Sequence, residues 1–371
     1  MSIIRYALSD SAVVFNNQVN EIRIRKGVWN YEEAILSLEA ESEAVKDLVF
    51  AAFSDLDAGK AVDFDEYMQK YSISSAEKEG ILSMVTGLKE QCYIVDAERS
   101  NTTQLLHDLI NGTYEAVGLQ NDVYLNPILF FSDNVIIKKE AARLCESVSL
   151  PIHILTDEEY SVILNSDVVT RFDGCTTKND LAKICDIIAP YCCIVGGVGK
   201  LNVSFMRSLN RALIELSKPL SMALLDGPFT SVFTIKPPET GCFECMEQRI
   251  FARIQDHPVY RRFIDSTRSK KINKNAVYYT PLLSSAVSTA IFEGLTISAI
   301  GKSKFAGRAL NTYVPVMELQ VEDILRVPYC PACGTIAKAQ IDEMYTSSKK
   351  LVDTILEKIE LKNQIFKQCY K

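Results

Sequence analysis

The sequence of 371 residues lacks three features that would place it outside the class of soluble, cytoplasmic proteins. No run of about 20 apolar residues is present, so no membrane-spanning helix is expected. The stretch Met1-Ser-Ile-Ile-Arg-Tyr6 has no apolar signal-peptide core. An excess of basic charge is also missing, because 40 lysines and arginines are mixed with 47 aspartates and glutamates. We therefore expect neither a membrane nor nucleic acid as a partner.

The composition is that of a folded protein kept in a reducing compartment. Apolar residues make up 47% of the chain, which at this length is enough for two or three domains with buried cores. There are 11 cysteines, and several stand alone in apolar surroundings, as Cys145 and Cys185 do. Buried free thiols of this kind are typical of a reducing cytosol.

Four cysteines form a pattern with a specific chemistry. Cys242-Phe-Glu-Cys245 and Cys330-Pro-Ala-Cys333 are two Cys-x-x-Cys turns separated by 84 residues, with Gly241 and Gly334 beside them. Each turn presents two thiolates at a separation that suits a tetrahedral cation, and two turns supply a closed four-thiolate site. The alternatives are redox dithiols or chance spacings. We predict a structural zinc ion held by these four cysteines, with no open position for catalysis.

The first 95 residues predict a small module of three strands followed by three helices and a last extended segment. A capping box, Ser74-x-x-Glu77, marks the start of the third helix. The single tryptophan, Trp29, is expected in core or sheet packing. The predicted elements are strands at Ala12–Phe15, Glu21–Arg25 and Glu33–Leu38, helices at Val45–Phe53, Phe64–Met68 and Ala76–Cys92, and an extended run at Tyr93–Val95.

A sheet this small has an unpaired edge, and adding an extended peptide to such an edge is a known mode of recognition. The topology resembles the winged-helix-like, PqqD-like precursor-peptide recognition element of ribosomal-peptide modifying enzymes. The stretch Ile22–Leu38 looks like the clamp of ThiF-like partner proteins in thiazole and oxazole peptide pathways. The resemblance implies that a leader peptide pairs with the third strand and packs on the third helix, through Ala34, Ile35, Leu36, Ser37, Leu38, Ile81, Met84, Val85 and Leu88.

A winged helix that binds DNA is the alternative for this module. Its third helix offers only Lys78 and Lys89 against Glu77, Glu79 and Glu90. Contact with phosphates is therefore disfavoured, and peptide binding is the preferred interpretation.

From about residue 96 to 340 the pattern is α/β. Strand, helix and strand at residues 127–155 predict a parallel crossover unit. A later strand runs into Gly196-Gly-Val-Gly-Lys-Leu-Asn202, where Gly197 and Gly199 form a turn suited to a phosphate and Asp226 stands where a ribose ligand is expected. The third glycine of the dinucleotide fingerprint is replaced by Asn202. An inherited tight turn remains the alternative, and we expect no bound nucleotide.

The order of these motifs, from the glycine turn through the Asp226-Gly-Pro segment to the two cysteine pairs, resembles the superfamily of ThiF, MoeB and the ubiquitin-activating enzymes. It looks closest to bacteriocin-type ThiF-like proteins, relatives of McbB and of the thiopeptide-pathway partners. An adenylating member needs arginines, lysines and an aspartate around the triphosphate. Only Lys200 and Arg207 lie near the glycines, and no acceptor cysteine stands outside the predicted zinc site. We therefore assign no catalytic residue.

The rest of the second domain and the tail predict packing surfaces. Pro281–Ile300 is an apolar helix rich in small residues and interrupted by Gly294. It is expected to be buried or to face a second subunit, because ThiF-like folds commonly dimerise through such a face. The basic run Arg268–Lys274 is typical of a solvated loop or of a contact for an acidic partner. Residues 341–371 predict a C-terminal helix.

The sequence thus predicts an α/β protein with a leader-recognition domain (1–95), a ThiF/MoeB-like Rossmann-type domain with a four-cysteine zinc site (96–340) and a terminal helix (341–371). Family resemblance implies a scaffold subunit that presents a precursor peptide to a YcaO-type cyclodehydratase and to a flavin-dependent dehydrogenase. Two alternatives stay open. One is an ATP-dependent adenylating enzyme, and the other is a winged-helix regulator.

Overall fold

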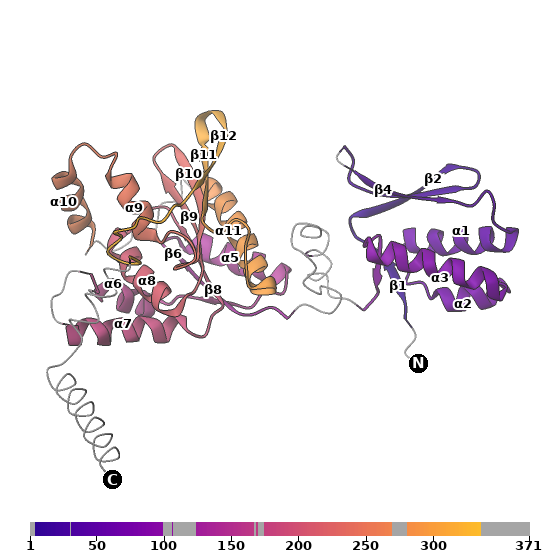
Figure 1. The fold of residues 1–371 in the computed structure, drawn as a ribbon, viewed down its shortest axis with the longest axis horizontal. Coiled ribbons are helices and arrows are strands. Elements are labelled where there is room, and N and C mark those ends of the chain that lie inside the picture. Colours follow the sequence, from indigo (N-terminus) through magenta and orange to yellow (C-terminus); the bar gives the residue numbers. More distant parts are fainter. Residues whose placement is uncertain are drawn as a thin grey trace, which may run out of the picture. The chain divides into compact units, whose positions relative to one another are not determined.

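The structure is a computed structural model, and it divides the chain into two compact units, Met1–Tyr124 and Leu125–Lys371 (Figure 1). The predicted C-terminal helix and most of the basic run after Arg268 lie outside the described residues. The structure describes residues 4–29, 31–98, 106, 124–166, 168–169, 174–268 and 280–334, with the backbone alone at 174–176.

The first unit contains the three strands and three helices that the sequence predicts, in the predicted order. A short strand near the start, which the sequence analysis missed, pairs with the last one to form a second sheet of two strands. The elements are β1 (Tyr6–Leu8), β2 (Ala12–Gln18), β3 (Glu21–Lys26), β4 (Glu32–Ser37), α1 (Glu43–Asp57), α2 (Phe64–Lys70), α3 (Ser75–Glu90) and β5 (Ile94–Asp96).

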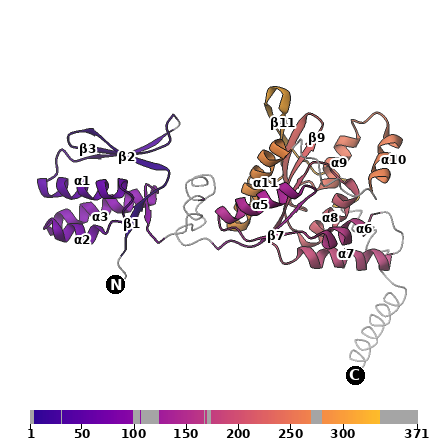
Figure 2. The ribbon, with the colours of Figure 1, turned by 180° about the vertical axis from the view of Figure 1, so that it is seen from behind.

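The antiparallel sheet β2-β3-β4 separates a core face from a charged face. Ile22 and Ile24 of β3 are buried against the helices, and the sheet lies over α1 in both views (Figures 1 and 2). Arg23 and Arg25 point to the other face, because strand side chains alternate. There both pair with Glu33, at 2.8 and 2.7 Å. The predicted capping box of α3 is present as well.

Trp29 contradicts the prediction that it packs in the core or on the sheet. Its side chain is 91% exposed at the tip of the β3–β4 hairpin. Gly27, with φ of +82°, begins this turn and aims the following residues outward. Because Trp29 is the only tryptophan, it is a built-in fluorescent reporter for this end of the sheet.

The second unit is built on a mixed sheet of seven strands in the order β12-β11-β10-β9-β8-β6-β7. Strands β6 to β9 are parallel, and β9 to β12 form an antiparallel extension. The strands are β6 (Ile128–Ser132), β7 (Ile152–Ile154), β8 (Cys193–Val198), β9 (Leu220–Asp226), β10 (Phe229–Ile235), β11 (Arg308–Tyr313) and β12 (Glu318–Asp323). The helices are α5 (Val135–Ser147), α6 (Asp157–Asn165), α7 (Gly174–Ile188), α8 (Val203–Leu216), α9 (Phe243–Phe251), α10 (His257–Arg268), α11 (Thr280–Ile300) and the 3-10 turn η2 (Val314–Val316).

Helices cover both faces of this sheet (Figures 1 and 2). Helices α5 and α11 lie on one face, and α6, α7 and α8 lie on the other, where they close a large apolar core. The chain order reverses between β6 and β8, so the crevice at the carboxyl ends of these two strands is the topological switch point, where α/β folds bind ligands.

Among the described helices, only α11 is long and apolar enough to cross a membrane. Of its most apolar stretch of 18 residues, 56% is buried within the unit. It packs against the sheet, as the sequence predicted for a buried helix. Gly294 does not interrupt it. A Cβ there would stand 2.7 Å from a methyl carbon of Val195, so glycine permits the close approach of the helix to β8.

Candidate functional site

The four predicted cysteines meet at one buried point. Their sulfur atoms all lie within 4.8 Å of one another, and the four side chains are at most 3% exposed. The Sγ–Sγ distances are 3.7 Å between Cys242 and Cys245, 3.6 Å between Cys242 and Cys330, and 3.4 Å between Cys245 and Cys333. Four sulfurs at about 2.3 Å from a tetrahedral zinc ion would lie about 3.8 Å apart. The cluster therefore has the donor set and nearly the size of a metal site.

The surroundings favour thiolates at this point. The Val327 amide donates to Cys245 Sγ at 3.3 Å, and the Ala332 amide donates to Cys330 Sγ at 3.4 Å. The Cys242 thiol donates to Cys245 Sγ, which lowers the pKa of Cys245 and raises the pKa of Cys242. Thiolate is the form that ligates a metal, so a cation would replace the protons shared within the cluster.

A buried ion pair holds the cysteine centre to the core of the second unit. Arg211 of α8 makes a two-pronged contact with Glu244 at 2.8 and 3.0 Å, and its other amino group donates to the Pro331 carbonyl at 2.7 Å. One side chain thus joins both cysteine turns. Burial raises the pKa of Glu244, and Arg211 opposes this shift. This pair was not predicted, because nothing in the sequence spacing links position 211 to either turn.

Arg207 is also occupied. Its guanidinium contacts both carboxylate oxygens of Glu247, at 2.9 and 2.6 Å, and the Tyr260 hydroxyl donates to the same carboxylate at 3.1 Å. The sequence analysis considered Arg207 as a phosphate ligand near the glycines. Its contacts place it against α9 instead.

The glycine turn is closed by a carboxylate of the protein itself. Asp133 follows β6 and accepts the amides of Gly199 and Lys200, both at 2.9 Å. An anion bound at this turn would use the same donors. Burial raises the pKa of Asp133, and the two amide hydrogen bonds oppose this shift. At the switch point, Asp133 therefore stands where a phosphate would bind.

The residues predicted to bind a nucleotide, Gly197, Gly199 and Asp226, lie in three different environments. Gly197 lies inside β8, where a Cβ would stand 2.3 Å from a methyl carbon of Val287, so it serves the packing of α11. Gly199 lines a hollow of about 310 Å³ with Leu225, Phe229 and Leu282 among others, and none of the lining residues is charged. Asp226 is exposed at the end of β9. Among the described residues that line this hollow, none would neutralise a triphosphate.

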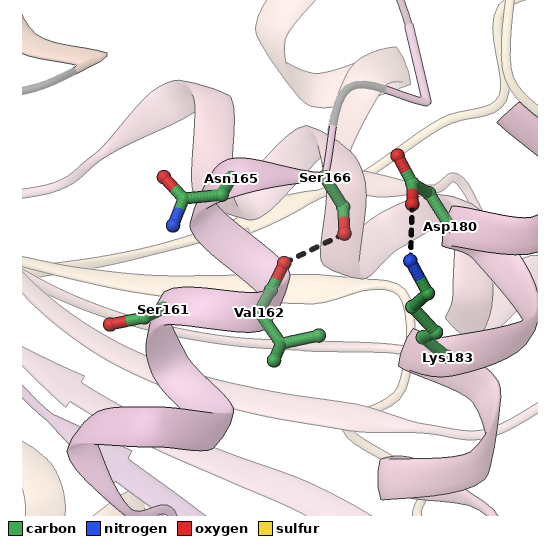
Figure 3. A pocket seen from close by; sticks show the side chains of 6 residues that line it. All are labelled: Ser161, Val162, Asn165, Ser166, Asp180 and Lys183. Carbon is green, nitrogen blue, oxygen red and sulfur yellow. Dashed lines mark hydrogen bonds and ion pairs between the residues drawn. The ribbon is translucent and has the colours of Figure 1, made fainter. Parts of the chain in front are cut away.

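A second hollow, of about 300 Å³, lies between α6 and α7 (Figure 3). Several of its polar groups already have partners within the chain. Lys183 pairs with Asp180 at 3.0 Å, and the Ser166 hydroxyl donates to the Val162 carbonyl at 2.7 Å (Figure 3). Among the described residues that line it, no nucleophile has a base beside it.

In the first unit, β4 is an edge strand whose outer side has no partner among the described residues. The Leu38 amide donates to the Asn20 carbonyl at 2.8 Å, so this pair is hydrogen-bonded in the ladder to β3. Backbone groups alternate in direction along an antiparallel strand. The amides and carbonyls of Glu33, Ile35 and Ser37 therefore point away from β3 and are open to an added strand.

One flank of α3 lies beside this open edge. At 100° per residue, Gly80, Met84 and Gly87 share a flank with Glu77 and Gln91. The Ser42 hydroxyl, just after β4, donates to Glu77 at 2.7 Å, and Lys26, opposite the start of β4, contacts the Gln91 carbonyl at 3.4 Å. The helix thus runs along the sheet with this flank toward β4. A Cβ built on Gly80 or Gly87 meets no atom within 4 Å, so the flank is open.

The predicted peptide-binding residues do not all face outward. Ile35 is 54% exposed, Ser37 is exposed, and Ala34, Leu36 and Met84 are half-buried. By contrast, Leu38, Ile81, Val85 and Leu88 are at most 4% exposed, within the core of the unit. These four side chains hold the helix and the strand together. The glycine flank of α3, which the sequence analysis did not single out, is the accessible part.

Comparisons with known proteins bear on the fold. No family model matches the sequence, and no curated protein matches it. Among solved structures, the heterocyclase TruD is similar over 89% of this chain and 43% of that chain, with a TM-score of 0.57 and 14% identity. A heterocyclase in complex with substrate and cofactor is similar over 89% of this chain and 40% of that chain, with a TM-score of 0.57 and 11% identity.

E. coli MccB, solved with ATP, is similar over 89% of this chain and 99% of that chain, with a TM-score of 0.47 and 11% identity. The chain spans less than half the length of the two heterocyclase chains. At 14% identity or below, the likeness is one of fold. This mixed α/β chain therefore shares its fold with a part of the heterocyclase TruD.

Proposed function

We propose that this protein is a leader-peptide-binding scaffold subunit of a thiazole- or oxazole-forming peptide synthetase. Its first unit would be a winged-helix-like clamp and its second a ThiF-like body braced by zinc. It would present a precursor peptide, of a thiopeptide or microcin-like type, to a YcaO-type cyclodehydratase and then to a flavin-dependent dehydrogenase. We place it in the cytoplasm, as a homodimer. The fold shared with part of TruD supports this class of pathway.

The observation that carries the proposal is the open edge of β4 beside the glycine flank of α3. Outward amides and carbonyls at Glu33, Ile35 and Ser37 would bind the backbone of an extended peptide, which is how edge strands recognise peptides. Glycine at Gly80 and Gly87 would let that backbone approach the helix closely. Side chains of the peptide that point toward α3 would contact Met84.

The charges around this edge fit a peptide better than DNA. Arg23 and Arg25, the basic residues on the open face of the sheet, are already paired with Glu33. On α3, Lys89 pairs with Asp96 at 2.9 Å. Binding to the phosphates of DNA needs lysine or arginine side chains that are not already paired with carboxylates. The winged-helix regulator is thus the weaker hypothesis.

The second unit favours a scaffold over an adenylating enzyme. Asp133 occupies the amides that would bind a phosphate, and Arg207 is engaged by Glu247. A subunit without chemistry can still control the rate, because holding the leader raises the effective concentration of the core peptide at the partner's active site. Adenylation predicts exchange of pyrophosphate into ATP by the purified chain, which we do not expect.

The test uses Trp29, which lies at the hairpin tip next to β4. Titration of the purified chain with the leader segment of the precursor encoded beside this gene should shift the tryptophan emission to shorter wavelength. Ile35→Pro removes only an outward amide, which edge strands tolerate, so it should leave the fold intact and weaken binding about tenfold or more. Ile35→Ala keeps the amide and is the matched control, with a smaller loss expected.

Two outcomes would contradict the proposal. One is no emission change and no binding by the wild type in a parallel fluorescence-polarisation titration. The other is equal binding by the Ile35→Pro and Ile35→Ala chains, which would place the peptide away from the β4 edge. Circular dichroism of both variants checks that the sheet is retained.

A further inference from the structure

The second unit has an edge strand of its own, with an unusual surface. Every residue of β12 is exposed, and the β11–β12 hairpin extends beyond the rest of the sheet (Figures 1 and 2). Leu319 and Val321 are 64% and 60% exposed, and the turn before them adds Val316 and Met317 at 67% and 69%. Leu319 and Val321, which share one side of β12, form what we call the apolar face. Exposed apolar groups that lie side by side mark interaction sites.

The opposite side of β12 is acidic. Glu318, Gln320 and Glu322 alternate with the apolar residues and point to the other side of the sheet. Glu318 accepts a hydrogen bond from Gln320 at 3.2 Å, and Glu322 accepts one from Asn311 at 3.3 Å. Within the described parts of the chain, neither carboxylate has a cationic partner. We call this side the acidic face.

The backbone of β12 is ready to pair. The Ile324 amide donates to the Gly307 carbonyl at 2.6 Å, and the Val314 amide of the neighbouring strand donates to the Pro228 carbonyl at 3.0 Å. Both hydrogen bonds imply the same pattern along the strand, in which the backbone groups of Glu318, Gln320 and Glu322 are hydrogen-bonded to β11. Leu319, Val321 and Asp323 therefore turn their amides and carbonyls outward.

A second copy of the chain fits this edge poorly. Two-fold antiparallel pairing about Gln320 sets Glu318 opposite Glu322 of the copy. Pairing about Glu322 sets that carboxylate opposite itself, and pairing about Val321 sets the charge of Asp323 opposite Leu319. Like charges directly opposite one another destabilise a sheet. The acidic residues thus protect the edge from self-association while leaving it open to a partner of opposite charge.

We infer that β12 is a docking strand for a protein partner that adds a strand alternating apolar with lysine or arginine residues. The partner's apolar side chains would continue the apolar face, and its basic side chains would pair with Glu318 and Glu322. The backbone supplies affinity, and the charges set register and partner choice. This inference rests on β12 alone and is independent of the peptide site on β4.

The test uses the full chain and three amide-capped peptides of seven residues. The first peptide alternates lysine or arginine with valine or leucine. The second has glutamate in place of the basic residues of the first. The third has the same composition as the first, but with its basic residues grouped together and its apolar residues grouped together. Isothermal titration should show binding of the alternating basic peptide only, with weaker binding at high salt. The double variant Glu318→Lys, Glu322→Lys should lose about tenfold for the basic peptide and gain the acidic one.

A reversal of preference is a result that misfolding would not produce. The inference would be overturned if the third peptide, in which the basic and apolar residues are grouped, bound as tightly as the alternating basic peptide. It would also be overturned if no peptide bound. Light scattering of the wild type tests whether a second copy of the chain binds β12 instead. A concentration-dependent dimer that Val321→Lys abolishes would assign the strand to a second copy and overturn it as well.

Discussion

In the second unit the cysteine centre is closed on itself, whereas in the first unit the β4 edge leaves its polar groups open. The four sulfurs are buried and receive backbone amides, and Arg211 joins the two turns that carry them. On β4, three residues turn amides and carbonyls to solvent, beside a helix flank without side chains at Gly80 and Gly87. The first arrangement joins segments of the fold, and the second leaves backbone groups available to the peptide that we propose.

The same difference separates the two glycine-rich places in the chain. At the switch point, Asp133 fills the position of an anion and Gly197 is used for helix packing. At Gly80 and Gly87 of α3, no atom of the described residues lies within 4 Å of the position where a Cβ would be. Glycine in a helix interior costs stability. Two such residues facing open space on one flank are consistent with the proposal that a peptide runs along it.

The largest expected effect tests the closed region. Cys245→Ser should remove a ligand of the proposed zinc and unfold much of the second unit, because structural zinc contributes about 10 kcal/mol in small zinc domains. Calorimetry should show that the transition of this unit falls by about 10 °C or more. A strong chelator should have the same effect on the wild type, and elemental analysis should find about one zinc per chain.

Cys192→Ser is the matched control, since Cys192 lies in the same unit but away from the cysteine centre. It should melt like the wild type. The leader-induced shift of Trp29 emission should survive in the Cys245→Ser chain if the two regions work separately. A chain that is free of metal and indifferent to the chelator would refute the zinc proposal.

An intermediate effect is expected on the open region, with opposite signs for stability and binding. Gly87→Ala should stabilise the first unit by about 0.5–1 kcal/mol, because alanine favours a helix and its Cβ meets open space. Gly87→Gln should weaken leader binding about tenfold, because a long side chain would fill the flank beside β4. Urea denaturation and the Trp29 titration measure the two quantities.

Leu82→Gln is the control for this helix, because Leu82 is 49% exposed and, at 100° per residue, lies on the side of α3 opposite the glycine flank. It should change neither quantity by more than a small amount. If Gly87→Gln binds the leader as tightly as the wild type does, the peptide does not run along this flank.

The sequence was sufficient for the features that depend on local periodicity. Alternation in Glu21–Arg25 and the capping box at Ser74 gave the right elements, and the two cysteine pairs were correctly expected to converge. Such signals need only neighbouring residues, or ligands of one type at a characteristic spacing.

Features that depend on long-range packing were missed. The apolar stripe of α3 was assigned to a ligand, although Ile81, Val85 and Leu88 form the core of their own unit. Periodicity identifies an apolar face without telling what covers it. Trp29 was expected inside because of its type, but the Gly27 turn places it at a hairpin tip. The contacts of Arg211 and Asp133 join segments far apart in the chain, which a single sequence does not reveal.

The smallest expected effect tests whether Asp133 closes the glycine turn to anions, as the four cysteines would close their own site around a metal. Asp133→Ala removes the carboxylate that accepts the Gly199 and Lys200 amides, and so frees these two backbone donors for another acceptor. Inorganic phosphate could then bind there weakly and raise the melting temperature at millimolar concentrations. Asp133→Asn keeps one acceptor oxygen and should respond less. A wild-type chain stabilised by phosphate as much as the alanine variant would show that the turn is open to anions, and Asp133 would then not be its built-in ligand.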